Sequence, residues 1–282
     1  MPRFPSTRPK FGRWFRLNNP SDIRRVGIVA NPKVSDGHFE RLSAALGKRG
    51  VEIAEVRPHD EPDGEVDLDL VFVLGGDGTM LRAARMYPGR VLLGVNLGQV
   101  GFMSGMRPEE MESGVEKVLS GGLDVQEYRM LEVRVGDQAP LTAVNDAVLV
   151  KPRPHQVVSV EVCVGGEELV SLQCDGFIAS TPLGSTAYAL SAGGPIVSGD
   201  VPCYELVSIA PHSLVARPMV LGEAQVTDLR IRERGALLSI DGDEPFEVPE
   251  GERIKIGLSR KSVRIGRTDE WTWWRAVRRT FL

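Results

Sequence analysis

The first half of the chain alternates continuous apolar runs with segments of helical periodicity. Residues 26–30, 68–74 and 91–95 are short and almost wholly apolar, which is typical of strands in a parallel sheet that is covered on both faces. Residues 51–56 alternate instead and predict a further strand. Helical spacing of apolar positions predicts helices over 36–49, 80–87 and 108–119. Strands and helices that alternate with short connections indicate a doubly wound α/β sheet.

From about residue 124 the pattern changes to a period of two. Apolar and polar positions alternate in short segments that are separated by turns such as Gly136-Asp137. The predicted strands cover 128–135, 141–150, 157–164, 168–174, 204–210, 226–232, 236–241 and 253–258. Such a series is typical of an antiparallel β domain. The last residues, 271–282, are aromatic and basic with helical spacing, and we expect them to pack on the body of the protein.

Composition restricts the class of protein. With 282 residues, of which 42% are hydrophobic and 26% charged, the chain is long enough for one large domain or two ordinary ones and is typical of a soluble protein. No apolar run approaches the roughly 18 residues of a membrane span. The three cysteines lack C-x-x-C spacing, which argues against a disulfide framework and a zinc site. We therefore expect a cytoplasmic protein.

Charge is distributed unevenly along the chain, although the formal net charge is only −4. Residues 1–25 carry seven Arg and Lys and one acidic residue, and residues 260–282 carry seven and two. The residues between them carry 20 basic and 35 acidic side chains, which makes this part poorly suited to nucleic acid. Prolines at positions 2, 5 and 9 argue against an amphipathic targeting helix, so we interpret 1–25 as a basic extension.

The sequence Gly75-Gly76-Asp77-Gly78-Thr79 stands where a buried strand ends and a helix begins. Open α/β sheets bind ligands at this edge. Glycines permit a tight or left-handed backbone and close approach, and a helix N-terminus offers N–H groups to an anion. A phosphate repels the Asp77 carboxylate unless a metal ion bridges them or the carboxylate accepts a proton. We predict a phosphate loop with a functional Asp77; an aspartate that caps the helix is the alternative.

Two further segments carry polar groups beside predicted strands. Residues 96–103 follow the next strand at the same sheet edge, where Phe102 can form one wall of a base or ribose pocket or part of the core. Asn145 and Asp146 fall within the apolar strand 141–150, and their side chains are expected on opposite faces. A buried member of that pair needs hydrogen-bond partners, which ribose hydroxyls supply.

The run from Asp175 to Val197 holds many small and hydroxyl-bearing residues and few that build a core. The backbone of such a run can approach a ligand closely. Gly184-Ser185-Thr186 is expected to begin a helix whose N–H groups hold a phosphate, with Tyr188 stacking or hydrogen bonding; a capped turn is the alternative. The chain has no Walker A, G-x-G-x-x-G or G-x-S-x-G sequence, and its four histidines lack metal-ligand spacing.

Together these segments resemble the NAD kinase family. The resemblance covers about residues 26–258 and is carried, in the family's order, by 75–79, 96–102, Asn145-Asp146, 175–188, 190–196, 211–218 and Asp241-Gly242. It implies transfer of the ATP γ-phosphoryl group to the 2′-hydroxyl of the adenosine ribose of NAD, with Mg²⁺ on the triphosphate. It also implies an α/β domain of 26–124 joined by the returning segment 259–282, an all-β domain of 125–258, and a homodimer or homotetramer.

By position, the resemblance makes Asp77 the catalytic carboxylate and assigns two sets of binding residues. The phosphate loop comprises Gly75, Gly76, Gly78 and Thr79. The NAD-binding set comprises Asp77, Gly78, Phe102, Asn145, Asp146, Asp175, Thr186, Ala187, Tyr188, Ser191 and Asp241. No protein ligand to a metal ion is assigned. The expected partners are NAD and ATP, and neither nucleic acid nor a membrane.

Three positions depart from the family's usual sequence. Asp146 replaces a commoner glutamate, Leu183 stands where Thr or Ser is usual, and Gln173-Cys174 precede Asp175 where Gly or Ser is more usual. Two other functions are weighed against the NAD kinase. A lipid kinase with the same glycine-rich loop is disfavoured by the polar run after Asp175, and a non-catalytic NAD(P) sensor is disfavoured by the intact catalytic aspartate.

Overall fold

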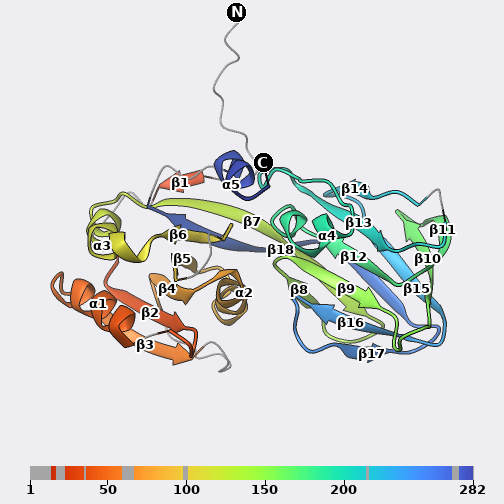
Figure 1. The fold of residues 1–282 in the computed structure, drawn as a ribbon, viewed down its shortest axis with the longest axis horizontal. Coiled ribbons are helices and arrows are strands. Elements are labelled where there is room, and N and C mark those ends of the chain that lie inside the picture. The colour runs from red at the N-terminus through yellow and green to blue at the C-terminus, as the bar shows by residue number, and fades with distance from the viewer. Residues whose placement is uncertain are drawn as a thin grey trace, which may run out of the picture. The chain divides into compact units, whose positions relative to one another are not determined.

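The computed structural model describes residues 14–16, 23–34, 36–58, 67–97, 101–213, 216–268 and 273–281. The chain forms two compact units, Met1–Tyr128 with Ser262–Leu282 and Arg129–Lys261, whose elements are labelled in Figure 1. Most of the predicted basic extension, residues 1–13 and 17–22, lies outside the described residues. Among the described residues, no helix is long and apolar enough to cross a membrane.

The first unit is built on a sheet of parallel strands. Its order is β18-β5-β4-β2-β3, and β6 also pairs with β5. The strands are β2 (Arg25–Ala30), β3 (Glu52–Pro58), β4 (Leu70–Gly75), β5 (Val91–Asn96), β6 (Ser104–Met106) and the second half of β18 (Arg253–Arg267). β1 (Trp14–Arg16) lies antiparallel to β7 (Asp124–Val135). The pairing of β18 with β5 confirms that the C-terminal segment returns to the α/β domain.

Helices cover both faces of this sheet. α1 (Asp36–Gly47) and α3 (Met111–Leu119) contribute Leu46 and Val115 to the same core as Phe72 of β4. On the other face, Gly94 of β5 packs against Met80 of α2 (Asp77–Met86). The two residues are so close that a side chain at residue 94 would overlap the methionine. Leu93 and Gly94 are consecutive residues of β5 and point to opposite faces of the sheet, so each contacts a different helical layer.

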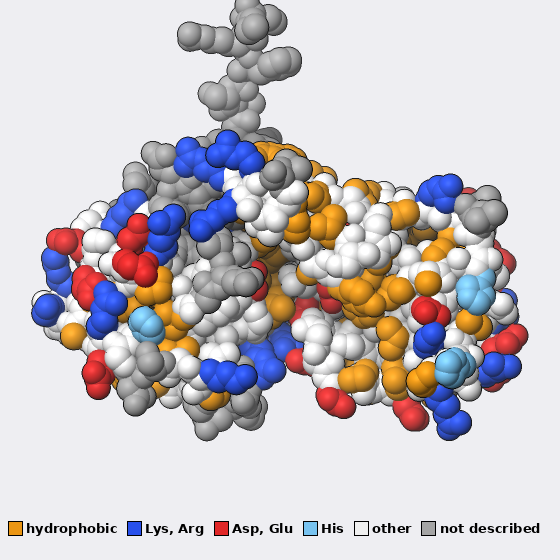
Figure 2. Space-filling model, in the orientation of Figure 1, with side chains coloured by type: hydrophobic (Ala, Val, Ile, Leu, Met, Phe, Trp, Pro, Cys, Tyr) orange, Lys and Arg blue, Asp and Glu red, His pale blue; other side chains and the backbone are white. Residues whose placement is uncertain are grey.

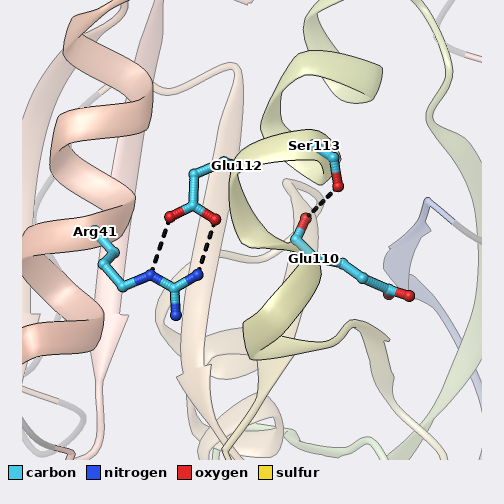
Figure 3. A network of polar contacts seen from close by, with 4 residues as sticks. All are labelled: Arg41, Glu110, Glu112 and Ser113. Carbon is cyan, nitrogen blue, oxygen red and sulfur yellow. Dashed lines mark hydrogen bonds and ion pairs between the residues drawn. The ribbon is translucent and has the colours of Figure 1, made fainter.

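An ion pair joins the two helices that share a face. The guanidinium of Arg41 in α1 donates to both carboxylate oxygens of Glu112 in α3, at 3.0 and 2.8 Å (Figure 3). The pair raises the pKa of Arg41 and lowers that of Glu112 through this hydrogen bonding. Both side chains are exposed, so the pair contributes little to stability.

The second unit consists of two antiparallel sheets around one core. The first has the order β11-β10-β15-β18, with β7 and β8 attached. Its further strands are β8 (Leu141–Ala143), β10 (Val158–Val164), β11 (Glu167–Cys174) and β15 (Thr227–Glu233). The second has the order β14-β13-β12-β9-β16-β17. Its strands are β9 (Asp146–Val150), β12 (Gly176–Ser180), β13 (Cys203–Ile209), β14 (Met219–Gly222), β16 (Ala236–Ile240) and β17 (Phe246–Val248). The shared core includes Val160 and Leu229 from the first sheet and Leu149, Phe177 and Leu238 from the second.

The predicted fold, a doubly wound α/β domain with an antiparallel β domain, is confirmed, but several elements differ in detail. The predicted strand 141–150 is two strands, because the chain bends at residues 144–145. The helix after β4 begins at Asp77 rather than at residue 80. Short strands β6, β14 and β17 were not predicted, since three or four residues carry too little periodicity. At the C-terminus α5 (Trp273–Phe281) is helical as predicted, while residues 271, 272 and 282 lie outside the described residues.

Candidate active site

The glycine-rich loop lies at the carboxyl ends of the parallel strands. Gly75 ends β4 and stands beside Asn96, the last residue of β5. Asn31 follows β2 at the same edge, and its Nδ2 donates to Thr79 Oγ1 at 3.5 Å. Neighbouring strands therefore end together around this loop, which is the edge where open α/β sheets bind ligands. Asn31 had no signal of its own in the sequence, because Asn-Pro is also an ordinary turn pair.

The glycines of the loop allow neighbouring groups to approach the backbone closely, and they do not adopt unusual backbone angles. None of the three has a positive φ, so the left-handed backbone considered from sequence does not occur here. A Cβ on Gly75 would stand closer than 3.0 Å to Thr79 Oγ1, so this glycine lets the first turn of α2 fold back on β4. Gly76 and Gly78 are exposed, and a Cβ on either would meet nothing within 4 Å. The space above these two glycines is open to a ligand.

Asp77 is the first residue of α2, and its carboxylate is oriented by the backbone of a second segment. Its Oδ2 accepts the N–H of Phe102 at 2.9 Å and its Oδ1 accepts the N–H of Met103 at 3.1 Å. Gly101 touches the carboxylate so closely that any Cβ would overlap it. A negative charge in the first turn of a helix is also stabilised by the helix dipole. Residues 98–100 of the predicted 96–103 segment lie outside the described residues.

Phe102 is part of the core in this structure. Its ring is 7% exposed and packs against two rings of α5, with centroid distances of 5.3 Å to Trp273 and 5.7 Å to Phe281. Of the two alternatives left by the sequence, a core phenylalanine is therefore the one observed. Ala276 and Val277 of α5 are also buried, whereas its arginines are exposed, and basic side chains gather over this helix in Figure 2.

In the second unit, Asp241 organises the bend between β8 and β9. Its carboxylate accepts the N–H groups of Val144 at 2.9 Å, Asn145 at 2.7 Å and Asp146 at 3.1 Å. Asp241 has φ +50°, a left-handed conformation that aspartate adopts more readily than most residues. The break in the predicted strand 141–150 follows from this carboxylate, because the amides of Val144 and Asn145 turn toward it, and the ladder resumes at Asp146.

Asn145 and Asp146 stand at the end of β9 with polar groups held below the surface. The Asp146 side chain is 6% exposed, and burial together with the nearby Asp241 carboxylate raises the pKa of Asp146 to about 7. Among the described residues, Asn145 Oδ1 is buried and has no hydrogen-bond partner. Because buried polar groups are normally paired, this pair is a suitable place for the hydroxyls of a ligand.

The run that begins at Asp175 is more structural than its composition suggests. Every residue of β12 is buried in the middle of the second sheet. Thr181 Oγ1 donates to the carbonyl of Val144 at 2.7 Å and accepts the N–H of Gly184 at 3.1 Å. The N–H of Ser185 donates to the carbonyl of Thr181 at 2.9 Å, and its hydroxyl donates to Pro182. The N–H groups of Gly184 and Ser185 are therefore engaged within a capped turn, which is the alternative that the sequence left open.

The remaining predicted NAD contacts fall at two places on this sheet. Thr186 and Ala187 are half-buried and lead into the short α4 (Tyr188–Ser191), which exposes Tyr188 and Ser191 on one face. Asp175 lies at the opposite end of β12 and forms an ion pair with Lys151 at 2.8 Å. The structure thus brings together Asn145, Asp146, Asp241 and the 184–188 turn, and separates Asp175 from them by the length of β12, roughly 16 Å.

Two buried residues escaped the sequence analysis. Glu205 of β13 is 1% exposed, and neither carboxylate oxygen has a hydrogen-bond partner among the described residues. Burial raises the pKa of Glu205 to about 8. Arg267 at the end of β18 is also 1% exposed. Residues 203–207 of β13 and 265–267 of β18 are buried without alternation, so the period-two pattern does not mark either side chain as inward-facing.

Known proteins resemble this chain over most of its length. Residues 52–123 match the ATP-NAD kinase N-terminal domain family, and residues 144–268 match the ATP-NAD kinase C-terminal domain family. An NAD kinase of Methanothermobacter thermautotrophicus is 35% identical over 258 residues, which is 86% of this chain and 90% of that protein. An NAD kinase of Leifsonia xyli is 36% identical over 254 residues, 86% of this chain and 81% of that protein.

Two solved structures share the fold. An NAD kinase from Archaeoglobus fulgidus in complex with ATP superposes with a TM-score of 0.75 at 28% identity, covering 91% of this chain and 97% of that one. Yeast NADH kinase complexed with NADH gives a TM-score of 0.81, covering 92% of this chain and 87% of that one. The latter is 24% identical, so it supports the fold alone.

Proposed function

Because this chain belongs to the ATP-NAD kinase family, we propose that it transfers the γ-phosphoryl group of ATP to the 2′-hydroxyl of the adenosine ribose of NAD, producing NADP. One observation carries the proposal furthest. An oriented carboxylate, Asp77, stands at a strand end between two open glycines, Gly76 and Gly78. The triphosphate of ATP and the attacking ribose 2′-hydroxyl can both approach a carboxylate in this position.

The chemistry needs little more than positioning and a proton acceptor. In phosphoryl transfer the enzyme aligns the attacking oxygen with the γ-phosphorus and stabilises the charge that develops. We assign Asp77 the role of orienting the ribose 2′-hydroxyl and accepting its proton as the new P–O bond forms. The bond between the γ-phosphorus and the bridging oxygen breaks, and ADP leaves. The two amides that hold Asp77 keep the carboxylate in place for this step.

Mg²⁺ fits this site as an ion that arrives with ATP. Among the described residues there is no cluster of three or more His, Cys, Asp or Glu side chains that could hold a metal ion alone. Mg²⁺ commonly uses one or two carboxylates together with substrate phosphates and water. When bound, it neutralises charge on the triphosphate, and the exposed loop at Gly76 and Gly78 leaves room for such a complex.

We assign NAD binding to the polar groups that the second unit leaves available. Asn145 Oδ1 and the Asp146 carboxyl suit ribose hydroxyls, since both are buried acceptors next to an ordered bend. Tyr188 is 46% exposed and can stack on a base or hydrogen bond, with Ser191 on the same helix face. We also propose a cytoplasmic homodimer or homotetramer, which light scattering of the purified protein and cell fractionation would test.

The decisive assay supplies ATP, Mg²⁺ and NAD and detects NADP with an NADP-specific dehydrogenase. NADP should accumulate only when a phosphate donor and NAD are both present. Absence of NADP with ATP and with polyphosphate would contradict the proposal. Phosphorylation of diacylglycerol in place of NAD would indicate a lipid kinase. Saturable NAD binding without turnover would indicate a sensor.

A further inference from the structure

The C-terminal end of β18 reaches the backbone that holds Asp77. Arg267 is the last residue of β18 and the largest fully buried side chain among the described residues. Its Nη2 donates to the carbonyl oxygen of Phe102 at 2.7 Å, and its Nη1 donates to that of Ser104. A guanidinium presents its donors as a rigid planar fork, so both carbonyls are held in one geometry. Burying this charge is costly unless hydrogen bonds compensate it, and the two carbonyls supply part of that compensation.

One peptide group links Arg267 to the carboxylate. The carbonyl of Phe102 and the N–H of Met103 belong to the same peptide unit. Arg267 donates to that carbonyl, and the N–H on the other side donates to Asp77 Oδ1. A hydrogen bond to the carbonyl polarises the peptide and strengthens its N–H as a donor. Electrostatic influence therefore passes from the guanidinium to Asp77 through a single peptide unit.

The backbone around Arg267 is fixed against the same segment. A Cβ on Gly105 would stand closer than 3.0 Å to the carbonyl oxygen of Gly266, so these two backbones are in contact. Thr268 Oγ1 donates to the carbonyl of Gly105 at 2.9 Å. The contact between Gly105 and Gly266 holds β18 against this segment without the Thr268 hydroxyl, and the Thr268 N–H also donates to the carbonyl of Gly105 at 3.3 Å. Thr268 offers a matched control, because it binds the neighbouring carbonyl and does not contact the peptide that faces Asp77.

We propose that Arg267 is a positioning residue for phosphoryl transfer, which acts on Asp77 through the 102–104 backbone. The inference rests on the proposed function and adds a residue from the C-terminal strand to it. Lysine cannot replace arginine fully, because one ammonium group cannot reproduce the planar fork toward two carbonyls. Loss of Arg267 leaves the carboxylate in the protein but frees the amides that orient it.

Kinetics of Arg267→Met, Arg267→Lys and the control Thr268→Val test the role. Arg267→Met should lower kcat about 10-fold. Arg267→Lys keeps the positive charge and should lower kcat about 3-fold or more, and it serves as the test variant in the event that Arg267→Met does not fold. In an Asp77→Asn background the same Arg267→Met change should lower the residual kcat less than about 2-fold, because the two residues act as a unit. Thr268→Val should lower Tm and leave kcat within about 2-fold.

Amide exchange gives a second readout that needs no turnover. In the wild-type protein the N–H groups of Phe102 and Met103 should exchange slowly, and Arg267→Met should speed their exchange about 10-fold while Thr268→Val leaves it unchanged. Unchanged exchange in Arg267→Met, or equal loss of kcat in the two Asp77 backgrounds, would overturn the inference. A wild-type protein that makes no NADP but shows the exchange response would contradict the proposed function and leave the positioning of Asp77 supported.

Discussion

Asp77 and Asp241 are held in the same way in different units of the chain. Each carboxylate accepts backbone N–H groups from a segment distant in sequence: Asp77 from residues 102–103, and Asp241 from residues 144–146. Their surroundings differ. Asp77 stands in the first turn of α2 between two open glycines, whereas Asp241 occupies a left-handed turn and faces the buried Asp146.

This difference separates a carboxylate that can meet substrate from one that shapes a binding surface. Accepting amide hydrogen bonds orients an aspartate but does not give it a chemical role. The open space above Gly76 and Gly78 gives Asp77 access to a phosphate and a hydroxyl. The carboxylate of Asp241 instead accepts hydrogen bonds from the backbone of the bend that carries Asn145 and Asp146. We therefore assign catalysis to Asp77 and organisation of the NAD site to Asp241.

The largest effect is expected for Asp77→Asn. The amide keeps the shape of the side chain and one acceptor oxygen but cannot take the proton of the ribose hydroxyl. Turnover should fall at least about 100-fold, while Tm changes by only a few degrees. Steady-state NADP formation and a thermal melt on one preparation check this. Near wild-type turnover would remove Asp77 from the mechanism.

The next effect is expected for Asp241→Asn, which should act on stability. Asparagine tolerates the left-handed backbone, so the loss comes from the amide bonds, of which the variant can keep only part. We expect a loss of about 2 kcal/mol in the free energy of unfolding, measured by urea denaturation. Asp243→Asn in the same turn is the control, within about 0.5 kcal/mol of wild type. Equal effects of the two changes would mean that the three amide bonds contribute little.

Two glycines sharpen the contrast between open and filled space around Asp77. Gly101→Ala pushes a methyl group into the carboxylate and should lower kcat about 10-fold.

Gly78→Ala meets open space within α2, so it should keep or slightly raise Tm, because alanine favours helix. It should raise KM for ATP several-fold if phosphate lies over this residue. An unchanged KM for ATP in Gly78→Ala would place the triphosphate elsewhere.

The smallest effect concerns a buried carboxyl in the second unit. The pKa of Glu205 is about 8 in the folded protein, above its ordinary value of 4.5, so the folded state keeps a proton that the unfolded state releases. Its contribution to stability is complete below pH 4.5 and is lost as pH rises toward 8. Glu205→Gln should therefore gain about 1 kcal/mol or more at pH 8 and little at pH 5. Melts at both pH values check the difference. A variant that loses stability equally at both would show that the carboxylate itself is needed.

Local sequence predicted the parts of the molecule that depend on local chemistry. The apolar run before Gly75 and the glycines after it were enough to place a ligand loop at a strand end, because strand, turn and helix signals are contiguous there. The alternating segments of the second unit were found for the same reason. The exact start of α2 was missed, since glycine next to aspartate is a weak helix signal and only the fold of Thr79 onto Gly75 fixes it.

Contacts between distant residues account for what the sequence could not predict. The bend at residues 144–145 depends on Asp241, ninety-six residues away. The small residues of β12 were assigned to a ligand site, whereas they are small because a buried central strand and the turn after it pack closely. The sequence around Phe102 fits a pocket wall or a core position, and only the contact with α5, far along the chain, places its ring in the core. None of these pairings leaves a periodic signal.

The most direct test of this division of roles is the NAD affinity of Asp77→Asn and Asp241→Asn, measured by calorimetry without ATP on the preparations used for turnover. We predict that Asp77→Asn binds NAD within about 3-fold of the wild-type Kd although it scarcely turns over, and that Asp241→Asn binds about 10-fold more weakly. A reversed order, in which Asp77→Asn loses NAD affinity and Asp241→Asn retains it, would contradict the account.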